Sequence, residues 1–342
     1  MASVNDLGEF ALVESLCRRL SDSVSGDVLV GPGDDAAVVS AGDNQFVMTA
    51  DALIEGVHFR RDWMTAHQLG WKALAVNVSD VAAMLAEPRY ALITLGLSGR
   101  ESVEFVDGVY DGALELAAEF GVQLIGGDTV KSPAGTMLSV TVIGTVVDGD
   151  AVLRSGAQLG DAIVATGTFG DSGMGLEILQ RPDFLKTHPH SMRYERLMHR
   201  HLQPMPRVRE GLSARAAGTV HAAIDVSDGL TTDLGRIAAS SVVGIEVQLS
   251  SVPLSEDGEQ VAPRLRIKAL DVALSSGEDY ELLLAVTEGD VPAVCDAITS
   301  QTGTQTTVVG HVVEGPAGIW GRDTNDGRVE LIGGYEHFAV AD

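Results

Sequence analysis

Short apolar runs and longer amphipathic stretches alternate along the first half of the chain. The short runs are rich in Val, Ile, Leu and Thr and are bounded by Gly, Asp or Pro, as β-strands usually are. They cover residues 27–31, 36–40, 45–50, 90–97 and 137–147. Two longer stretches, 66–85 and 102–120, carry apolar residues at helical spacing, and the second stops before Gly121, a common residue at helix ends. The pattern predicts a sheet with two helices.

A turn-rich stretch at Val147-Asp148-Gly149-Asp150 separates this half from a second one. Beyond it the alternation resumes. Strand-like segments lie at 161–166, 222–226, 245–249, 280–286 and 306–313, and helix-like segments at 230–240 and 291–300. We therefore expect an α/β protein of the α+β type, in which helices flank mixed sheets in two domains, residues 1–148 and 149–342.

Composition and charge narrow the classes of function. The 342 residues are 45% hydrophobic and 21% charged, enough for two compact globular domains. The net charge of −25 disfavours binding to nucleic acid or to an anionic membrane. No basic segment leads into an apolar core after Met1, and no uncharged apolar run approaches the roughly 18 residues of a membrane span. With two distant cysteines, Cys17 and Cys295, the pattern predicts a cytoplasmic protein.

Seven aspartates lie in five short motifs that contain Gly, Ser or Thr. The motifs are Gly33-Asp34-Asp35, Thr49-Ala50-Asp51, Asn77-Val78-Ser79-Asp80, Gly126-Gly127-Asp128-Thr129 and Asp225-Val226-Ser227-Asp228-Gly229. Each follows an apolar run, which would carry the carboxylate to the end of a strand or buried helix. Gathered without cations, these groups would repel one another and raise one another's pKa, so the pattern indicates bound metal. Oxygen ligands without His or Cys favour Mg²⁺, and several Mg²⁺ ions together usually accompany a polyphosphate. Alternatively, each aspartate taken alone only caps a helix or closes a turn.

Two further segments suggest chemistry less specifically. Residues 167–175 are glycine-rich and precede a predicted helix, so their backbone N–H groups are candidates to bind a phosphate. A tight strand-to-helix connection explains the same glycines. Residues 182–206 carry His188, His190, His199 and His201 among prolines, and their spacing fits no tight metal site. We expect a surface excursion with solvated histidines.

Nine strings along the chain resemble, in order and spacing, the thiamine-monophosphate kinase family, which belongs to the aminoimidazole ribonucleotide synthetase superfamily. They are GDDAAVV, ADALIEGVHF, KALAVNVSDVAAM, LIGGDTV, RSGAQLGD, TGTFGDSGMG, AIDVSDGLTTDLGRI, SSGEDYELL and GGYEHF. The resemblance covers nearly the whole chain, from Gly8 to Phe338. Two positions depart from the family pattern: Ala50 replaces a customary Thr, and Leu85 replaces a customary Gly.

The resemblance implies an activity and an assembly. The activity is transfer of the γ-phosphoryl group of ATP to the phosphate of thiamine monophosphate, with several Mg²⁺ ions as cofactors. The assembly is a homodimer in which the first domain pairs with its twin to build a barrel. The strands expected at 45–50, 90–97 and 137–147 agree with this, because they are apolar on more than alternate positions, as strands covered on both faces are. Two other functions stay open, a sister enzyme of the superfamily with another acceptor and a nucleotide- or metal-binding protein without turnover.

The resemblance also implies site residues. Metal ligands match Asp35, Thr49, Ala50, Asp51, Asp80, Asp128, Asp225 and Asp228, of which Asp80, Asp128 and Asp225 would act in catalysis through the metal. Nucleotide contacts match Gly127, Asp128, Arg154 and Ser227, and contacts to thiamine monophosphate match His58, Glu278 and Tyr335. Asp34 is expected to support its turn. A carboxylate and an aromatic face suit the fixed positive charge of the thiazolium ring.

Overall fold

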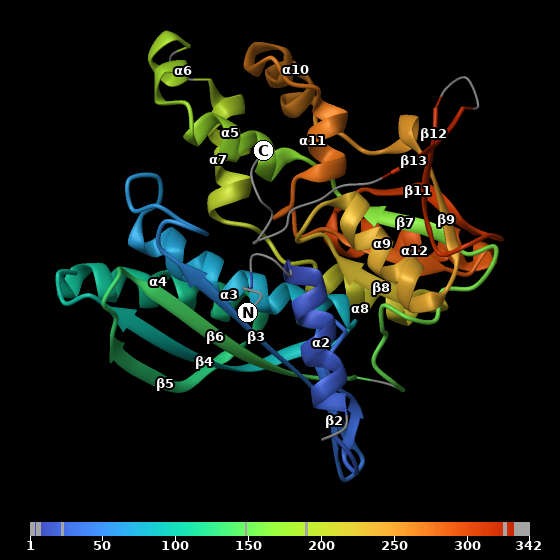
Figure 1. The fold of residues 1–342 in the computed structure, drawn as a ribbon, viewed down its shortest axis with the longest axis horizontal. Coiled ribbons are helices and arrows are strands. Elements are labelled where there is room, and N and C mark those ends of the chain that lie inside the picture. Colours follow the sequence, from blue (N-terminus) through green and yellow to red (C-terminus); the bar gives the residue numbers. More distant parts are fainter. Residues whose placement is uncertain are drawn as a thin grey trace.

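The computed structural model describes residue 4 and residues 8–21, 24–147, 149–188, 191–323 and 327–331. The first half forms a mixed sheet of six strands in the order β1-β2-β3-β6-β4-β5 (Figure 1). Its strands are β1 (Val28–Val30), β2 (Ala37–Ala41), β3 (Asn44–Ile54), β4 (Glu87–Leu97), β5 (Gln123–Lys131) and β6 (Met137–Thr145). Neighbouring strands are antiparallel except β4 and β5, which run parallel.

Helices α3 (Ala66–Ala83) and α4 (Val103–Phe120) cover one face of this sheet (Figure 1). Thr65 starts α3 with a capping box, and Ser102 caps α4, which ends at Gly121 in the left-handed region. The two helices approach closely through Gly70 and Gly112, where an added Cβ would lie within 1.8 Å of a carbonyl oxygen on the other helix. A third helix, α2 (Glu9–Ser21), precedes β1.

The second half forms a seven-stranded sheet in the order β13-β12-β9-β11-β7-β10-β8, with helices around it. Its strands are β7 (Ala162–Thr166), β8 (Val220–Asp225), β9 (Gly244–Gln248), β10 (Leu282–Val286), β11 (Thr306–Val313), β12 (Gly318–Arg322) and β13 (Arg328–Glu330). Its helices are α5 (Asp171–Leu179), α6 (Pro182–Thr187), α7 (Met192–Leu202), α8 (Val208–Ala217), α9 (Leu230–Ser241), α10 (Glu256–Leu265), α11 (Ala269–Ser275) and α12 (Val291–Thr302), with 3₁₀ turns η1 (Leu249–Ser251) and η2 (Glu288–Asp290). The predicted fold class is confirmed. No helix within the described ranges is long and apolar enough to cross a membrane.

The sequence interpretation was wrong at two places. Strand β5 was not expected, so Gly127 and Asp128 lie inside a strand and not in a turn. The expected surface excursion contains α7, whose Tyr194, Leu197 and His201 are buried against α5 and α10. His201 is therefore a buried histidine, whereas His188 and His199 are exposed and His190 lies outside the described residues.

Helix α3 lies between the two halves and is buried at 14 of its 18 residues. Ala83 and the following Leu85 pack with Val164, Ala223 and Leu282 of the second sheet. Leu85 adopts a φ of 49°, in the left-handed region that glycine occupies without strain, which gives a physical reason for the family's glycine at this position. Its side chain is nevertheless fully buried, so Leu85 combines backbone strain with core packing.

The other face of the six-stranded sheet has no helix on it among the described residues. Its exposed apolar side chains include Met48, Tyr90, Leu92 and Val130, each between 36% and 42% exposed. Strand register places these four on one face: Met48 and Tyr90 both pair with Ile143, and Leu92 pairs with Thr141 two residues along β6. Val130 pairs with Gly96, which shares the face of Leu92. The face is an apolar surface of the kind that second copies cover.

Candidate functional site

A cleft of about 980 Å³ opens between the two halves, and residues from both line it. Asp51 and His58, on and after β3, contribute from the first half. Ser227, Asp228 and Glu278, on loops that follow β8 and α11, contribute from the second half. The cleft thus combines predicted metal, nucleotide and substrate residues in one space.

Three carboxylates converge beside this cleft. One oxygen each of Asp35, Asp80 and Asp225 lies within 4.8 Å of the others. Asp35 stands before β2, Asp80 near the end of α3 and Asp225 at the end of β8, so the cluster joins residues that are up to 190 positions apart. Asp51 extends it toward the cleft, since its charge acts on both Asp80 and Asp228.

Helix α3 and strand β3 hold these carboxylates in place with hydrogen bonds. Thr49 Oγ1 donates to Asp80 Oδ2 at 2.5 Å, and Ser79 Oγ donates to Asp225 Oδ2 at 2.5 Å. The backbone N–H of Asp51 donates to Asn77 Oδ1 at 2.8 Å. Asn77 and Ser79 are fully buried, so their polar groups serve the site and not the solvent. By contrast, Ala50 alternates with Thr49 and Asp51 onto the other face of β3, so only its backbone could serve the site.

The cluster is electrostatically costly without a cation. Burial, followed by repulsion from Asp51, Asp225 and Asp35, raises the pKa of Asp80 well above its usual value. Burial and the charge of Asp35 do the same to the pKa of Asp225. Desolvation within the cleft, followed by Asp228, raises the pKa of Asp51. A divalent ion would reverse these effects, because it favours the ionised form of every carboxylate around it.

Two buried polar atoms beside the acid cluster lack a hydrogen-bond partner within the described ranges, and one of them suits a cation while the other suits an anion. Asp35 Oδ2 and Arg154 Nε are buried and have no hydrogen-bond partner among the described residues. The Arg154 guanidinium pairs with Asp35 through Nη2, so the free Nε lies at the edge of the acid cluster. Asp34 accepts hydrogen bonds from the N–H groups of Asp35 and Arg154 and supports the turn. An acidic cluster with an oxygen to spare suits Mg²⁺, and an arginine with a donor to spare suits a phosphate.

A loop in the second half is held by two residues that the sequence interpretation missed. Asp233 on α9 is fully buried and accepts hydrogen bonds from the N–H groups of Ser227 and Asp228 at 3.1 and 3.0 Å. Arg236 bridges Asp233 at 2.7 Å and Asp228 at 2.5 Å. Burial raises the pKa of Asp233 to about 7, although Arg236 opposes this. The position of Asp233 in the first turn of α9 was the available signal.

Asp128 lies apart from the cluster within one chain. Asp51 pairs with Val140, Val140 with Ile93, and Ile93 with Gly127, so β3 and β5 are three strands apart. At about 4.8 Å per strand, Gly127 is about 14 Å from Asp51. Asp128 pairs with Thr94 and so lies on the open face of the sheet. The nucleotide and metal roles of Gly127 and Asp128 stay predictions.

The wall opposite β3 is the segment 277–281, whose backbone is strained. Glu278 and Tyr280 have φ values of 65° and 52°, and an added Cβ at Gly277 would lie 1.9 Å from the Ser227 carbonyl oxygen. Two backbone hydrogen bonds fix the conformation of this segment: the Glu278 N–H donates to the Ser227 carbonyl and the Tyr280 N–H to the Val226 carbonyl, both at 2.9 Å. Residues other than glycine rarely adopt this conformation unless the surroundings impose it, and such strain is concentrated at functional sites.

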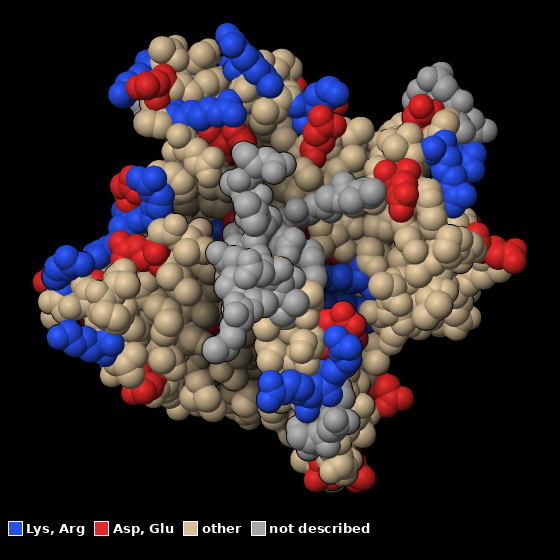
Figure 2. All heavy atoms as spheres, in the orientation of Figure 1, with Lys and Arg blue, Asp and Glu red and all other residues tan. Residues whose placement is uncertain are grey.

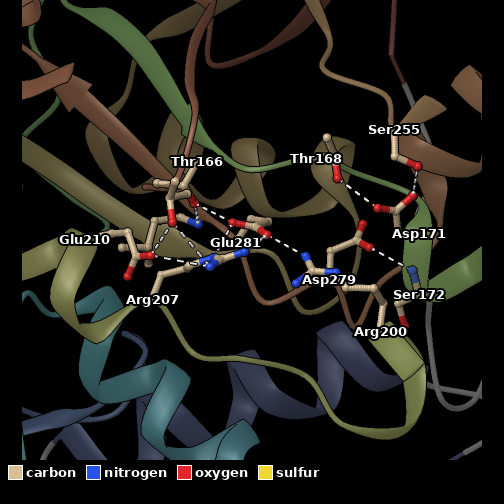
Figure 3. Close-up of polar contacts among 12 residues, drawn as sticks. Thr166, Thr168, Asp171, Ser172, Arg200, Arg207, Glu210, Ser255, Asp279 and Glu281 are labelled. Atoms are coloured by element: carbon tan, nitrogen blue, oxygen red, sulfur yellow. Dashed lines mark hydrogen bonds and ion pairs between the residues drawn. The ribbon is translucent and has the colours of Figure 1, made fainter. Parts of the chain in front are cut away.

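Two buried acidic residues of the segment 277–281, Asp279 and Glu281, hold its strained backbone in place (Figure 3). The Asp279 carboxylate accepts hydrogen bonds from the N–H groups of Gly170 and Ser172, at 2.7 and 3.1 Å. The Asp279 carboxylate therefore occupies the N-terminus of α5. The segment 167–175, a candidate to bind a phosphate, is a tight strand-to-helix connection whose N–H groups bind Asp279 instead. Glu281 accepts from Arg207 and Arg200 at 2.5–2.6 Å, and Figure 3 shows it between these two guanidiniums.

Glu278 projects from this segment toward three basic side chains. Its Oε1 lies 3.0 Å from Lys72 Nζ, and its Oε2 lies 3.1 Å from His201 Nδ1. Burial would raise the pKa of Glu278, but the basic side chains around it, Lys72 first, outweigh this and lower the pKa, so the carboxylate stays ionised. His58 Nδ1 accepts from the Ile54 N–H at 3.1 Å, which orients the ring at the cleft. Tyr335 lies outside the described residues.

The surface charges of the described residues are mixed in sign on the face of the molecule shown in Figure 2. On the face shown in Figure 2, described lysines and arginines are interspersed with acidic side chains. Several arginines with exposed or partly exposed side chains form ion pairs, as Arg193 and Arg196 do with Asp257.

Comparisons with known proteins agree with one another. Residues 33–146 match AIR synthase related protein, N-terminal domain, and residues 158–321 match its C-terminal domain. Thiamine-monophosphate kinase of Bacillus subtilis (strain 168) is 38% identical over 283 residues, which are 81% of this chain and 82% of that protein. The protein of the same name from Escherichia coli (strain K12) is 37% identical over 337 residues, 97% of this chain and 99% of that one.

Solved structures give the same relationship. The structure of AaThiL complexed with AMPPCP and TMP has a TM-score of 0.84 at 30% identity and covers 98% of this chain and 99% of its own. Thiamine-monophosphate kinase from Stenotrophomonas maltophilia K279a has a TM-score of 0.75 at 38% identity, covering 94% of this chain and 98% of its own.

Proposed function

Because this chain belongs to the thiamine-monophosphate kinase family, we propose that it transfers the γ-phosphoryl group of ATP to the phosphate of thiamine monophosphate. The products are thiamine diphosphate and ADP. One observation carries the proposal: a single cleft has Asp51 and Asp228, next to the acid cluster, and an ionised Glu278 together with His58 along its walls. A polyanion and a cationic ring could occupy such a cleft together.

Mg²⁺ is proposed as the cofactor. Asp35, Asp80 and Asp225 would hold it, with Thr49, Asp51 and Asp228 within the same group of side chains. When bound, the ions would neutralise charge on the transferring phosphoryl group and its neighbours. The fit rests on the spare oxygen of Asp35 and on the raised pKa values, both of which a cation would relieve.

The side chains of the chain itself bind and orient the two substrates. Arg154 offers its unpaired Nε to a phosphate oxygen of the nucleotide. Glu278 offers an ionised carboxylate to the cationic ring of the acceptor. Backbone hydrogen bonds join the strained segment 277–281 to the loop at Ser227. They fix the distance between the Glu278 carboxylate, which faces the acceptor, and the loop that would contact the nucleotide. Phosphoryl transfer depends mainly on such positioning, since it needs little covalent chemistry from the protein.

A homodimer is proposed as the working assembly. The support is the open face of the six-stranded sheet, where Met48, Tyr90, Leu92 and Val130 are exposed on neighbouring strands. A second copy that covers this face would complete a barrel and bury these side chains. Asp128 lies on the same face, so in a dimer it would face the second copy, and its predicted role would depend on that contact.

The direct test is ATP consumption with different acceptors. Thiamine monophosphate, thiamine and aminoimidazole precursors are supplied side by side with Mg²⁺-ATP, and the phosphorylated product is identified. We expect turnover only with thiamine monophosphate. Turnover with an aminoimidazole precursor would assign the chain to a sister activity, and tight ATP binding without turnover of any acceptor would leave a nucleotide-binding protein.

A further inference from the structure

Lys72 is a lysine in the interior of α3 with no exposed surface. Its neighbours along the helix, Trp71, Ala73 and Leu74, are buried apolar residues. Its ammonium lies 3.0 Å from Glu278 Oε1, the one ion pair it makes among the described residues. A buried ion pair is often no more stable than apolar residues of the same volume, so stability alone does not account for a lysine here.

Buried side chains of the protein interior hold the Glu278 carboxylate, which is also open toward the cleft. Lys72 engages one carboxylate oxygen and His201 the other, while 27% of the side chain remains exposed. Burial lowers the pKa of His201 to about 4, so near neutral pH this histidine is uncharged, and the Lys72 ammonium is the positive charge in contact with the carboxylate. His201 in turn lies 3.1 Å from Ser172 Oγ on α5. The orientation of the carboxylate is thus set by α3 and α7, not by its own loop alone.

The same helix also carries Asp80 of the acid cluster. Lys72 and Asp80 are eight residues apart, which corresponds to about 12 Å along an α-helix. Since α3 is one continuous, buried helix, it fixes the spacing between the carboxylate for the acceptor and the ligands for the metal.

We infer that Lys72 is a positioning residue for the acceptor: it holds the Glu278 carboxylate toward the cationic ring of thiamine monophosphate, at a fixed distance from the acid cluster. The inference rests on the proposed function. Lys72 touches no substrate and acts only through Glu278, so its effect should appear in the binding of one substrate and not the other.

The test compares Lys72→Met, which keeps the aliphatic length, with the wild type. We expect the KM for thiamine monophosphate to rise at least tenfold and the KM for ATP to stay within twofold, when substrate binding is in rapid equilibrium. Lys268→Met is the matched control, because Lys268 is 82% exposed on the surface. Absence of wild-type turnover would refute the proposed function and this inference with it, whereas wild-type turnover with unchanged constants in Lys72→Met would refute the inference alone.

A double-mutant cycle with Glu278→Gln separates positioning from general damage. If Lys72 acts through Glu278, adding Lys72→Met to Glu278→Gln changes the KM for thiamine monophosphate by less than twofold. The double variant also leaves no unpaired buried charge, so it should keep the fold even if a single variant loses stability. Independent, multiplying effects of the two substitutions on that KM would overturn the inference.

A pH series adds a readout that a structural role would not move. Lys72 is the largest of the groups that lower the pKa of Glu278; His58 also faces the carboxylate, and His201, with a pKa of about 4, is uncharged over this pH range. In Lys72→Met the KM for thiamine monophosphate should therefore rise more steeply than in the wild type as pH falls from 8 to 6, and titration of the acceptor's own phosphate affects both proteins alike. Parallel pH profiles for the two proteins would count against the assignment.

Discussion

Asp80→Asn separates the chemistry of the acid cluster from its packing. The nearest oxygens of Asp35, Asp80 and Asp225 lie within 4.8 Å of one another. At that distance, with an effective dielectric constant of about 20, each like-charged pair costs about 3.5 kcal/mol. Asp80 takes part in two such pairs, and the carboxyls escape part of the cost by binding protons, as their raised pKa values indicate. We expect the metal-free variant to be about 1–3 kcal/mol more stable than the wild type, a rise of a few degrees in Tm.

Activity should move in the opposite direction. Asparagine keeps an oxygen for the hydrogen bond from Thr49, so the fold is retained, but it removes a carboxylate from the metal site. We expect turnover to fall by at least a thousandfold at ordinary Mg²⁺ and the stabilisation of the protein by Mg²⁺-ATP to shrink. Calorimetry with and without Mg²⁺-ATP, combined with the kinase assay, measures both effects. Asp271→Asn, on the exposed surface of α11, is the control.

Full activity of Asp80→Asn would refute the metal reasoning, and a variant that loses both stability and activity would show that Asp80 serves packing instead.

Three other perturbations test separate parts of the structure. Burial alone would raise the pKa of Glu281, but Arg207 and Arg200 lower it to about 2, so its charge stabilises the fold above about pH 4.5 and the benefit is lost as pH falls toward 2. Glu281→Gln should therefore cost about 3 kcal/mol in urea unfolding at pH 7 and less at pH 4, and a pH-independent difference would contradict this. His58→Ala should raise the KM for thiamine monophosphate far more than the KM for ATP in steady-state kinetics, and equal effects would reassign His58 to a structural role. Light scattering across a dilution series should give a dimer, and a fully active monomer at micromolar concentration would show that the open sheet face has another role.

Periodicity predicted most of the strands and the two long helices of the first half, because buried faces impose a regular spacing of apolar residues. Strand β5 escaped because Gly126 and Gly127 interrupt it, and glycine is untypical of strands. Helix α7 escaped because most of its residues are polar and only Tyr194, Leu197, His201 and Leu202 are buried.

The candidate site could be predicted by residue type and not by distance. The motifs around Asp35, Asp80 and Asp225 were visible, yet nothing along the chain says that their oxygens meet. The supporting role of His201 could not be predicted, since burial of a polar side chain depends on tertiary packing, and for Asp233 only its place in the first turn of α9 gave a signal. Lys72 offered a signal that was available: a charge inside the apolar run of a helix needs a buried partner.

Helix α3 has a consequence for folding cooperativity. Its C-terminal end packs into the core of the second sheet, and Ser79 donates a hydrogen bond across to Asp225. Residues 149–342 expressed alone would expose the apolar surface that Ala83 and Leu85 cover. We therefore expect the two halves on either side of residue 148 to fold as one cooperative unit. A ligand bound at either end of the cleft should therefore protect amides in both sheets from hydrogen exchange.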